Sequence, residues 1–243
     1  MLKNLFNGIK YFVSNFSLTL VYSIFVYFFT TFAILLSILF LLYGLPPYFS
    51  FYSTPLKTIL LNIHPVFLFL ILLVWCLFFQ FFSLFTISFL RRTYKKIKGR
   101  SVQLNPAKKE VFMFGNFIFF YHLFFVFLFL LLIEFFKNEL LSFVITILLM
   151  FISSFYILYF PFSFVKKRKN VKDYLSVSSK VFSKNLATTL FYVFLFSIVG
   201  FVINYYSLVI EGPILLLADF LFFALMFFTF FSIYLETEEH LKS

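Results

Sequence analysis

Two ionisable side chains, His122 and Asp219, stand inside long apolar runs of the sequence. A histidine and a carboxylate held together in apolar surroundings could pass on a proton or bind a cation, and burying such groups is costly. At a helical rise of about 1.5 Å per residue, their depths differ by only about 5 Å across a hydrocarbon layer of about 30 Å. We therefore predict a polar site at His122 and Asp219. The alternative is a neutral histidine bonded to a backbone carbonyl and an aspartate that reaches water.

No other pattern in the sequence indicates catalysis. There is no Gly-x-Ser-x-Gly turn, no His-Glu-x-x-His pair and no glycine-rich phosphate loop. Asp219 is the one aspartate inside an apolar run, and Cys76 has no second cysteine to pair with. We predict no catalytic residue, no metal site and no cofactor, and the sequence favours a protein that is not an enzyme.

The composition identifies the class of protein that carries these residues. Hydrophobic residues make up 63% of the 243 positions and charged residues 12%, whereas a soluble domain needs about a quarter charged residues. Each of the main apolar runs exceeds the roughly 20 residues that cross a membrane as a helix. We predict an all-α membrane protein, a single polytopic domain over residues 1–243, with six transmembrane helices at about 18–43, 65–90, 111–133, 140–165, 186–210 and 213–235.

The net charge of +11 is concentrated in alternate segments between these runs. Of the 20 Lys and Arg residues, 18 lie near the N-terminus, at 91–109, at 166–184 and at Lys242, and only Lys57 and Lys137 lie elsewhere. Positive residues mark cytoplasmic loops, so we predict a multi-pass protein of the cell membrane with both termini in the cytoplasm. This bias accounts for the charge without a nucleic-acid partner. Residues 91–110 are expected to form a basic loop and residues 236–243 an acidic tail.

Two amphipathic segments precede predicted spans. Asn170 and Asp173 form a capping pattern, which predicts a helix from Val171 with apolar or small residues along one stripe. Residues 1–17 show a similar pattern before the first span. We expect both to be helices in the membrane surface. The basic residues predicted to contact anionic lipid are Lys95, Lys96, Lys98, Lys166, Lys167, Arg168 and Lys169.

The two amphipathic segments also resemble each other. Residues 10–22 and 180–192 are identical at six of 13 positions, including Asn15 and Asn185 at the joints between surface helix and span. The pattern predicts a repeated unit in which the asparagine satisfies backbone groups as the chain turns into the membrane. A weaker third copy is centred on Asn116. The alternative is coincidence within a shared composition.

The segment from Ser178 to Asn185, Ser-x-x-x-Phe-Ser-Lys-Asn, feeds a pair of spans and is echoed at the N-terminus. It resembles the six-helix membrane domain associated with bacterial glycerophosphodiester phosphodiesterases. The resemblance implies a membrane module without the catalytic domain, because no His-Arg-Gly motif is present. We predict a non-enzymatic module that organises or helps to move lipids or a partner protein. Its expected partners are membrane lipids and a further membrane protein or a second copy of the chain. The alternative is a transporter of small solutes or ions with a cavity near His122 and Asp219.

Overall fold

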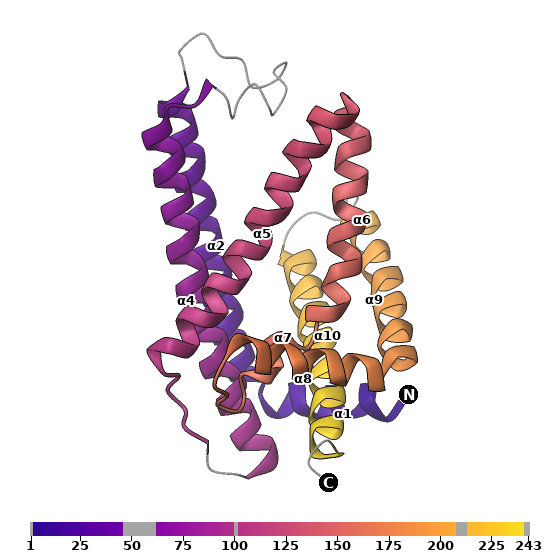
Figure 1. Ribbon diagram of the computed structural model, residues 1–243. Coiled ribbons are helices and arrows are strands. Elements are labelled where there is room, and N and C mark those ends of the chain that lie inside the picture. Colours follow the sequence, from indigo (N-terminus) through magenta and orange to yellow (C-terminus); the bar gives the residue numbers. More distant parts are fainter. Residues whose placement is uncertain (1, 46–61, 100–101, 208–212, 241–243) are drawn as a thin grey trace. The chain divides into compact units, whose positions relative to one another are not determined.

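The described part of the chain is helical and contains no strand, which confirms the predicted all-α class (Figure 1). The computed structural model describes residues 2–45, 62–99, 102–207 and 213–240. Its helices are α1 (Leu2–Ser14), α2 (Phe16–Gly44), α4 (Pro65–Lys98), α5 (Lys108–Phe136), α6 (Glu139–Ile157), α7 (Phe160–Ser163), α8 (Val171–Lys184), α9 (Leu186–Ser207) and α10 (Pro213–His240).

Six helical segments among the described residues are long and apolar enough to cross a membrane. They run over Phe16–Gly44, Pro65–Lys98, Lys108–Phe136, Leu140–Ser163, Leu186–Ile203 and Leu217–Glu239. Each lies on one of the predicted spans. The chain is therefore a multi-pass integral membrane protein, and the prediction of six spans is confirmed.

Two charged segments, one expected as a loop and one as a tail, are partly helical in the structure. The first part of the expected basic loop continues α4 to Lys98, and the helix ends where Gly99 takes the left-handed conformation with φ +64°. The first part of the expected acidic tail continues α10 to His240. Lysine, arginine and glutamate are good helix formers, so a charged segment can extend an apolar helix beyond the hydrocarbon layer.

The ends of α5 and α6 follow the sequence signals. Lys137 takes the left-handed conformation with φ 53°, and its N–H donates to the carbonyl oxygen of Ile133 at 2.8 Å, which ends α5. Pro161 lies in the first turn of α7, just after α6 ends at Ile157, where a residue without a backbone N–H is tolerated. Most of the connection between α2 and α4, and all of that between α9 and α10, lies outside the described residues.

The chain divides into two compact units, each built from segments distant in sequence. The first unit comprises Met1–Ser23, Ile87–Asn105 and Ser153–Ser243, and the second unit comprises Ile24–Thr86 and Pro106–Ile152. The first contains α1, α7, α8, α9 and α10, and α2, α4 and α6 contribute residues to both.

Helix α10 is the central element of the first unit. Buried residues make up 44% of its span, against 11–17% in the other five spans. Every residue from Phe228 to Leu235 is buried, so this part of the helix is covered on all sides. Helices α1 and α8 run crosswise to α10 near its C-terminal end, and both contact it (Figure 1).

The second unit is held together by aromatic packing and one amide pair. The ring of Phe25 on α2 stacks on Phe85 of α4 with centroids 5.0 Å apart. Between α4 and α5, Gln80 Nε2 donates to Asn116 Oδ1 at 2.6 Å. Interhelical hydrogen bonds of this kind contribute to the association of transmembrane helices, so the pair is explained by helix packing.

Candidate functional site

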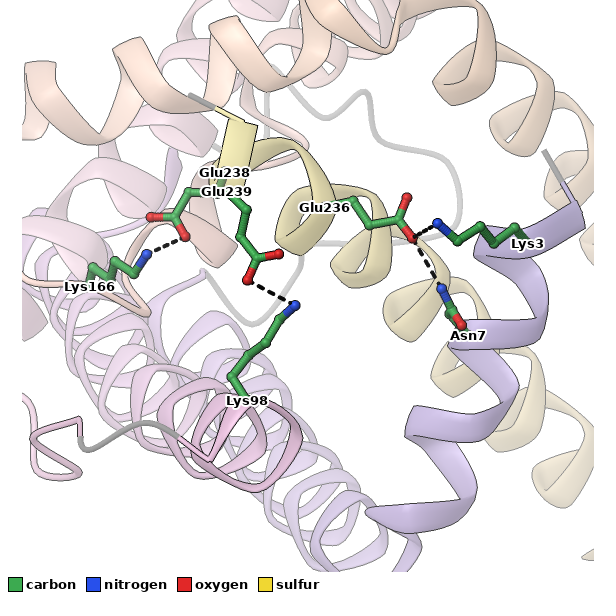
Figure 2. A network of polar contacts seen from close by, with 7 residues as sticks. All are labelled: Lys3, Asn7, Lys98, Lys166, Glu236, Glu238 and Glu239. Carbon is green, nitrogen blue, oxygen red and sulfur yellow. Dashed lines mark hydrogen bonds and ion pairs between the residues drawn. The ribbon is translucent and has the colours of Figure 1, made fainter. Parts of the chain in front are cut away.

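The C-terminal end of α10 carries three glutamates that contact other elements of the first unit. Glu236 Oε1 accepts a hydrogen bond from Asn7 Nδ2 at 3.1 Å and lies 3.3 Å from Lys3 Nζ, both on α1. Glu239 Oε1 lies 3.1 Å from Lys98 Nζ at the end of α4. Figure 2 shows these contacts. Because a helix C-terminus already carries partial negative charge, carboxylates there are stabilised when other elements supply cations.

Glu238 forms the buried member of this set. Its side chain is 4% exposed, and Oε2 lies 2.5 Å from Lys166 Nζ, while Arg168 Nη2 lies 3.6 Å from Oε1 (Figure 2 draws the Lys166 contact). Lys166 also lies over the ring of Tyr94, 5.7 Å from its centroid. A carboxylate removed from water needs partners of this kind to remain charged. The segment between α7 and α8 is thereby attached to α10.

Arg91, on the last turns of α4, is a buried cation. It is 1% exposed, and Nε donates to the carbonyl oxygen of Phe164 at 3.2 Å. Nη1 donates to the carbonyl oxygens of Gln103 and Asn105 at 3.3 and 3.4 Å. The five donors of a guanidinium suit several carbonyls at once. Arg91 therefore joins the segment after α4 to the C-terminal end of α7.

The two predicted helix joints have the same local structure. Nδ2 of Asn15 donates to the carbonyl oxygen of Tyr11, and Nδ2 of Asn185 to that of Val181, each four residues earlier and each at 2.8 Å. Asn185 also donates to Thr237 Oγ1 on α10 at 2.7 Å. Each asparagine satisfies a carbonyl at the end of a surface helix, as predicted. Asn116 is different, because α5 runs unbroken through it, so the weaker third copy is not a helix joint.

The structure gives internal partners to four of the seven residues predicted to contact lipid. Lys98, Lys166 and Arg168 pair with glutamates of α10. Lys96 Nζ donates to the carbonyl oxygen of Ser14. The remaining three, Lys95, Lys167 and Lys169, are exposed and have no hydrogen-bond or ion-pair partner among the described residues. Their contact with lipid stays a prediction.

The predicted polar site is not assembled within either unit. His122 belongs to the second unit and Asp219 to the first, so their pairing stays a prediction. The ring of His122 stacks on Phe79 with centroids 5.2 Å apart, and Nδ1 lies 2.8 Å from the carbonyl oxygen of Ile118. A carbonyl only accepts hydrogen bonds, so Nδ1 carries a proton. This hydrogen bond is the one expected under the alternative to a polar site, in which the histidine is bonded to a backbone carbonyl.

Within the described ranges, no group of three His, Cys, Asp or Glu residues is placed to hold a metal ion. The polar arrangement at the end of α10 consists of ion pairs and hydrogen bonds to α1, α4 and the segment before α8. It can fix the relative positions of α1, α4, α8 and α10, and it leaves a surplus of exposed lysines around them.

No known family model, curated protein or solved structure matches this chain.

Sequence reasoning missed Glu238 and Arg91 as buried charges. Glu238 belongs to a short acidic segment that reads as a solvated tail, and Arg91 to a basic segment that reads as a loop. The sequence did contain a signal. Each segment follows directly on an apolar run, with no glycine or proline at the junction. Such continuity favours an extended helix.

Proposed function

We propose that this integral membrane protein is a non-enzymatic module that binds anionic lipid head groups at its basic end and so organises lipids or a partner protein around it. The observation that carries the proposal is the imbalance of charge around α10. Glu236, Glu238 and Glu239 each form an ion pair with a lysine of the same chain. Lys95, Lys167 and Lys169 are exposed and unpaired within the described part of the chain.

The positions of these lysines in the chain support the proposal. Lys95 lies on the last turn of α4, and Lys167 and Lys169 lie between α7 and α8, so all three are next to the ends of candidate spans. Basic residues at that position are attracted to anionic lipids by about 1 kcal/mol each. By the positive-inside rule we place this end, together with both termini, on the cytoplasmic side of a cell membrane.

The proposal includes a relationship to the membrane domain associated with glycerophosphodiester phosphodiesterases, based on the motif that ends at Asn185. At both copies of the repeated joint, an asparagine donates to a carbonyl oxygen of the preceding surface helix where the chain turns into a span. A module built from such units supports a role in arranging lipids and partners.

The test uses the purified full-length chain and a variant with Lys95, Lys167 and Lys169 changed to Gln. Native mass spectrometry with phosphatidylglycerol and phosphatidylcholine measures how strongly each protein prefers the anionic lipid. Three lysines at about 1 kcal/mol each predict a loss of about a hundredfold in that preference. Lys137→Gln, at the turn after α5, is the matched control and should retain it. An unchanged preference in the triple variant would refute lipid binding by these lysines.

A further inference from the structure

The two surface helices of the repeat present opposite kinds of outer face. On α8, the apolar stripe that precedes the span is covered by protein, since Tyr174, Ser178 and Val181 are fully buried. What α8 exposes is polar, including Lys172 and Lys180. The apolar side of α8 is therefore buried by contacts within the chain, and its polar outer side suits contact with water or lipid head groups.

Helix α1 keeps an apolar face uncovered. Leu2, Phe6 and Val13 are 68%, 66% and 67% exposed, and Ile9 lies on the same side at 40%. The side of α1 that packs on protein is a different one and is marked by Gly8, which is buried. A Cβ at Gly8 would lie 2.8 Å from Thr229 Oγ1 and 3.0 Å from Thr229 Cα. Helix α1 therefore lies directly against the backbone of α10.

Contacts with α10 fix which edge of α1 points into the membrane. Near Lys3 and Asn7, α1 contacts Glu236. On the other side of the Gly8 crossing, Phe12 contacts Phe220 with ring centroids 6.1 Å apart, and Phe16, at the start of α2, contacts the same ring at 6.1 Å. Phe220 lies sixteen residues before Glu236, about 24 Å along a helix at 1.5 Å per residue. The polar edge of α1 thus faces the charged end of α10, and the aromatic edge faces the interior of its span.

The exposed apolar face of α1 adjoins that aromatic edge. At 100° per residue, Ile9, Leu2, Val13 and Phe6 follow Phe12 around the helix, while Lys3 and Lys10 lie beyond them at the polar edge. The start of α2, which follows α1 directly, also exposes apolar side chains, Leu20 and Val21 among them. Lipid acyl chains that surround α2 would therefore meet α1 as well.

We propose that the exposed face of α1 formed by Leu2, Phe6, Ile9 and Val13 is a binding surface for lipid acyl chains, set just below the head groups of one leaflet. The equivalent helix of the repeat, α8, does not enter the acyl chains. This inference deepens the proposed function and rests on the same placement of the basic end at the membrane surface. It assigns acyl-chain contact to α1 and leaves head-group contact to the lysines.

The test places a single tryptophan on each surface helix. Trp75 is the only tryptophan of the chain, so Trp75→Phe provides a background without tryptophan emission. Phe6→Trp and Lys180→Trp are introduced separately into this background, and each full-length protein is reconstituted into vesicles of phosphatidylcholine and phosphatidylglycerol. The vesicles carry bromine atoms either near the carbonyl end or near the methyl end of the acyl chains. Bromine quenches tryptophan only at close range.

For Phe6→Trp we expect blue-shifted emission that is quenched more strongly by bromine near the carbonyl end. For Lys180→Trp we expect red-shifted emission and little quenching. Red-shifted, unquenched emission from Phe6→Trp would mean that α1 faces water and would overturn the inference. Blue-shifted emission that no brominated lipid quenches would mean that protein, such as a second copy, covers the face, and would overturn it too. Quenching of Lys180→Trp would overturn the assigned difference between α1 and α8.

These outcomes are separable from those of the proposed function. The variant with Lys95, Lys167 and Lys169 changed to Gln should leave the quenching of Phe6→Trp unchanged, because none of these lysines lies on α1. Failure of the quenching test with a retained lysine effect would remove only the acyl-chain surface. Failure of the lysine test with retained quenching would remove only head-group binding.

Discussion

The carboxylate of Glu238 lies 2.5 Å from the ammonium group of Lys166, and the glutamate side chain is only 4% exposed. The two residues are 72 positions apart in sequence. Their ion pair attaches the segment before α8 to the buried end of α10. The pairs made by Glu236 and Glu239 are more exposed, with side-chain exposures of 36% and 42%. The three contacts therefore differ in what their removal should cost.

We predict that Glu238→Gln destabilises the protein by about 3 kcal/mol, because it leaves Lys166 and Arg168 without a buried anion. Glu236→Gln should cost about 0–1 kcal/mol, as exposed ion pairs do. Thermal unfolding of each variant in detergent, followed by fluorescence-detected gel filtration, measures the difference. Equal midpoints for the two variants would contradict the buried character of the Glu238 pair.

The two joint asparagines should differ in their contribution to stability. Asn185 donates both to its own helix and to Thr237 of α10, whereas the Asn15 side chain donates to Tyr11 and Ser14, which both lie in α1. A hydrogen bond contributes about 1 kcal/mol, so Asn185→Ala should lower stability by about 1 kcal/mol more than Asn15→Ala. In a Thr237→Val background, which lacks the oxygen that accepts from Asn185, most of the difference between the two asparagine variants should disappear. The midpoint of thermal unfolding again provides the measurement, and a larger loss in Asn15→Ala would refute the prediction.

Much of the fold follows from local patterns in the sequence. The six apolar runs, the helix start at Val171 and the asparagine joints each depend on residues within a few turns of one another. Asn170 and Asp173 form the predicted capping box, with the backbone N–H of Asn170 donating to the Asp173 carboxylate at 3.2 Å. Such signals are readable because the energies that produce them act over short distances along the chain.

The candidate site was less predictable because its energies come from distant residues. Whether Glu238 is a tail residue or a buried anion depends on Lys166 and Arg168, which a helical pattern around Glu238 cannot reveal. The same holds for the apolar stripe of α8. Periodicity predicts the stripe, but only the tertiary fold decides that protein covers it while the face of α1 stays exposed.

The crossing of α1 over α10 should not tolerate a side chain at Gly8. Because an added Cβ would meet the backbone of Thr229 at 3.0 Å, Gly8→Ala should force the helices apart and cost roughly 1–3 kcal/mol, as overpacking does. Lys10→Ala, at an exposed position on the same helix, is the control and should cost little. Thermal unfolding in detergent measures both. Unchanged stability in Gly8→Ala would mean that α1 does not pack closely on α10 in the membrane.

The orientation of the chain can be read from two lysines on either side of α6. Lys137 lies at the turn after α5 and Lys167 follows α7, so one candidate span separates them. The surplus of basic residues around Lys167 predicts that this end remains in the cytoplasm. In a Cys76→Ala background, which removes the only cysteine, Lys137→Cys should react with a membrane-impermeant maleimide in intact cells. Lys167→Cys should react only after permeabilisation, and the reverse pattern would invert the topology and move the lipid-binding end to the outer leaflet.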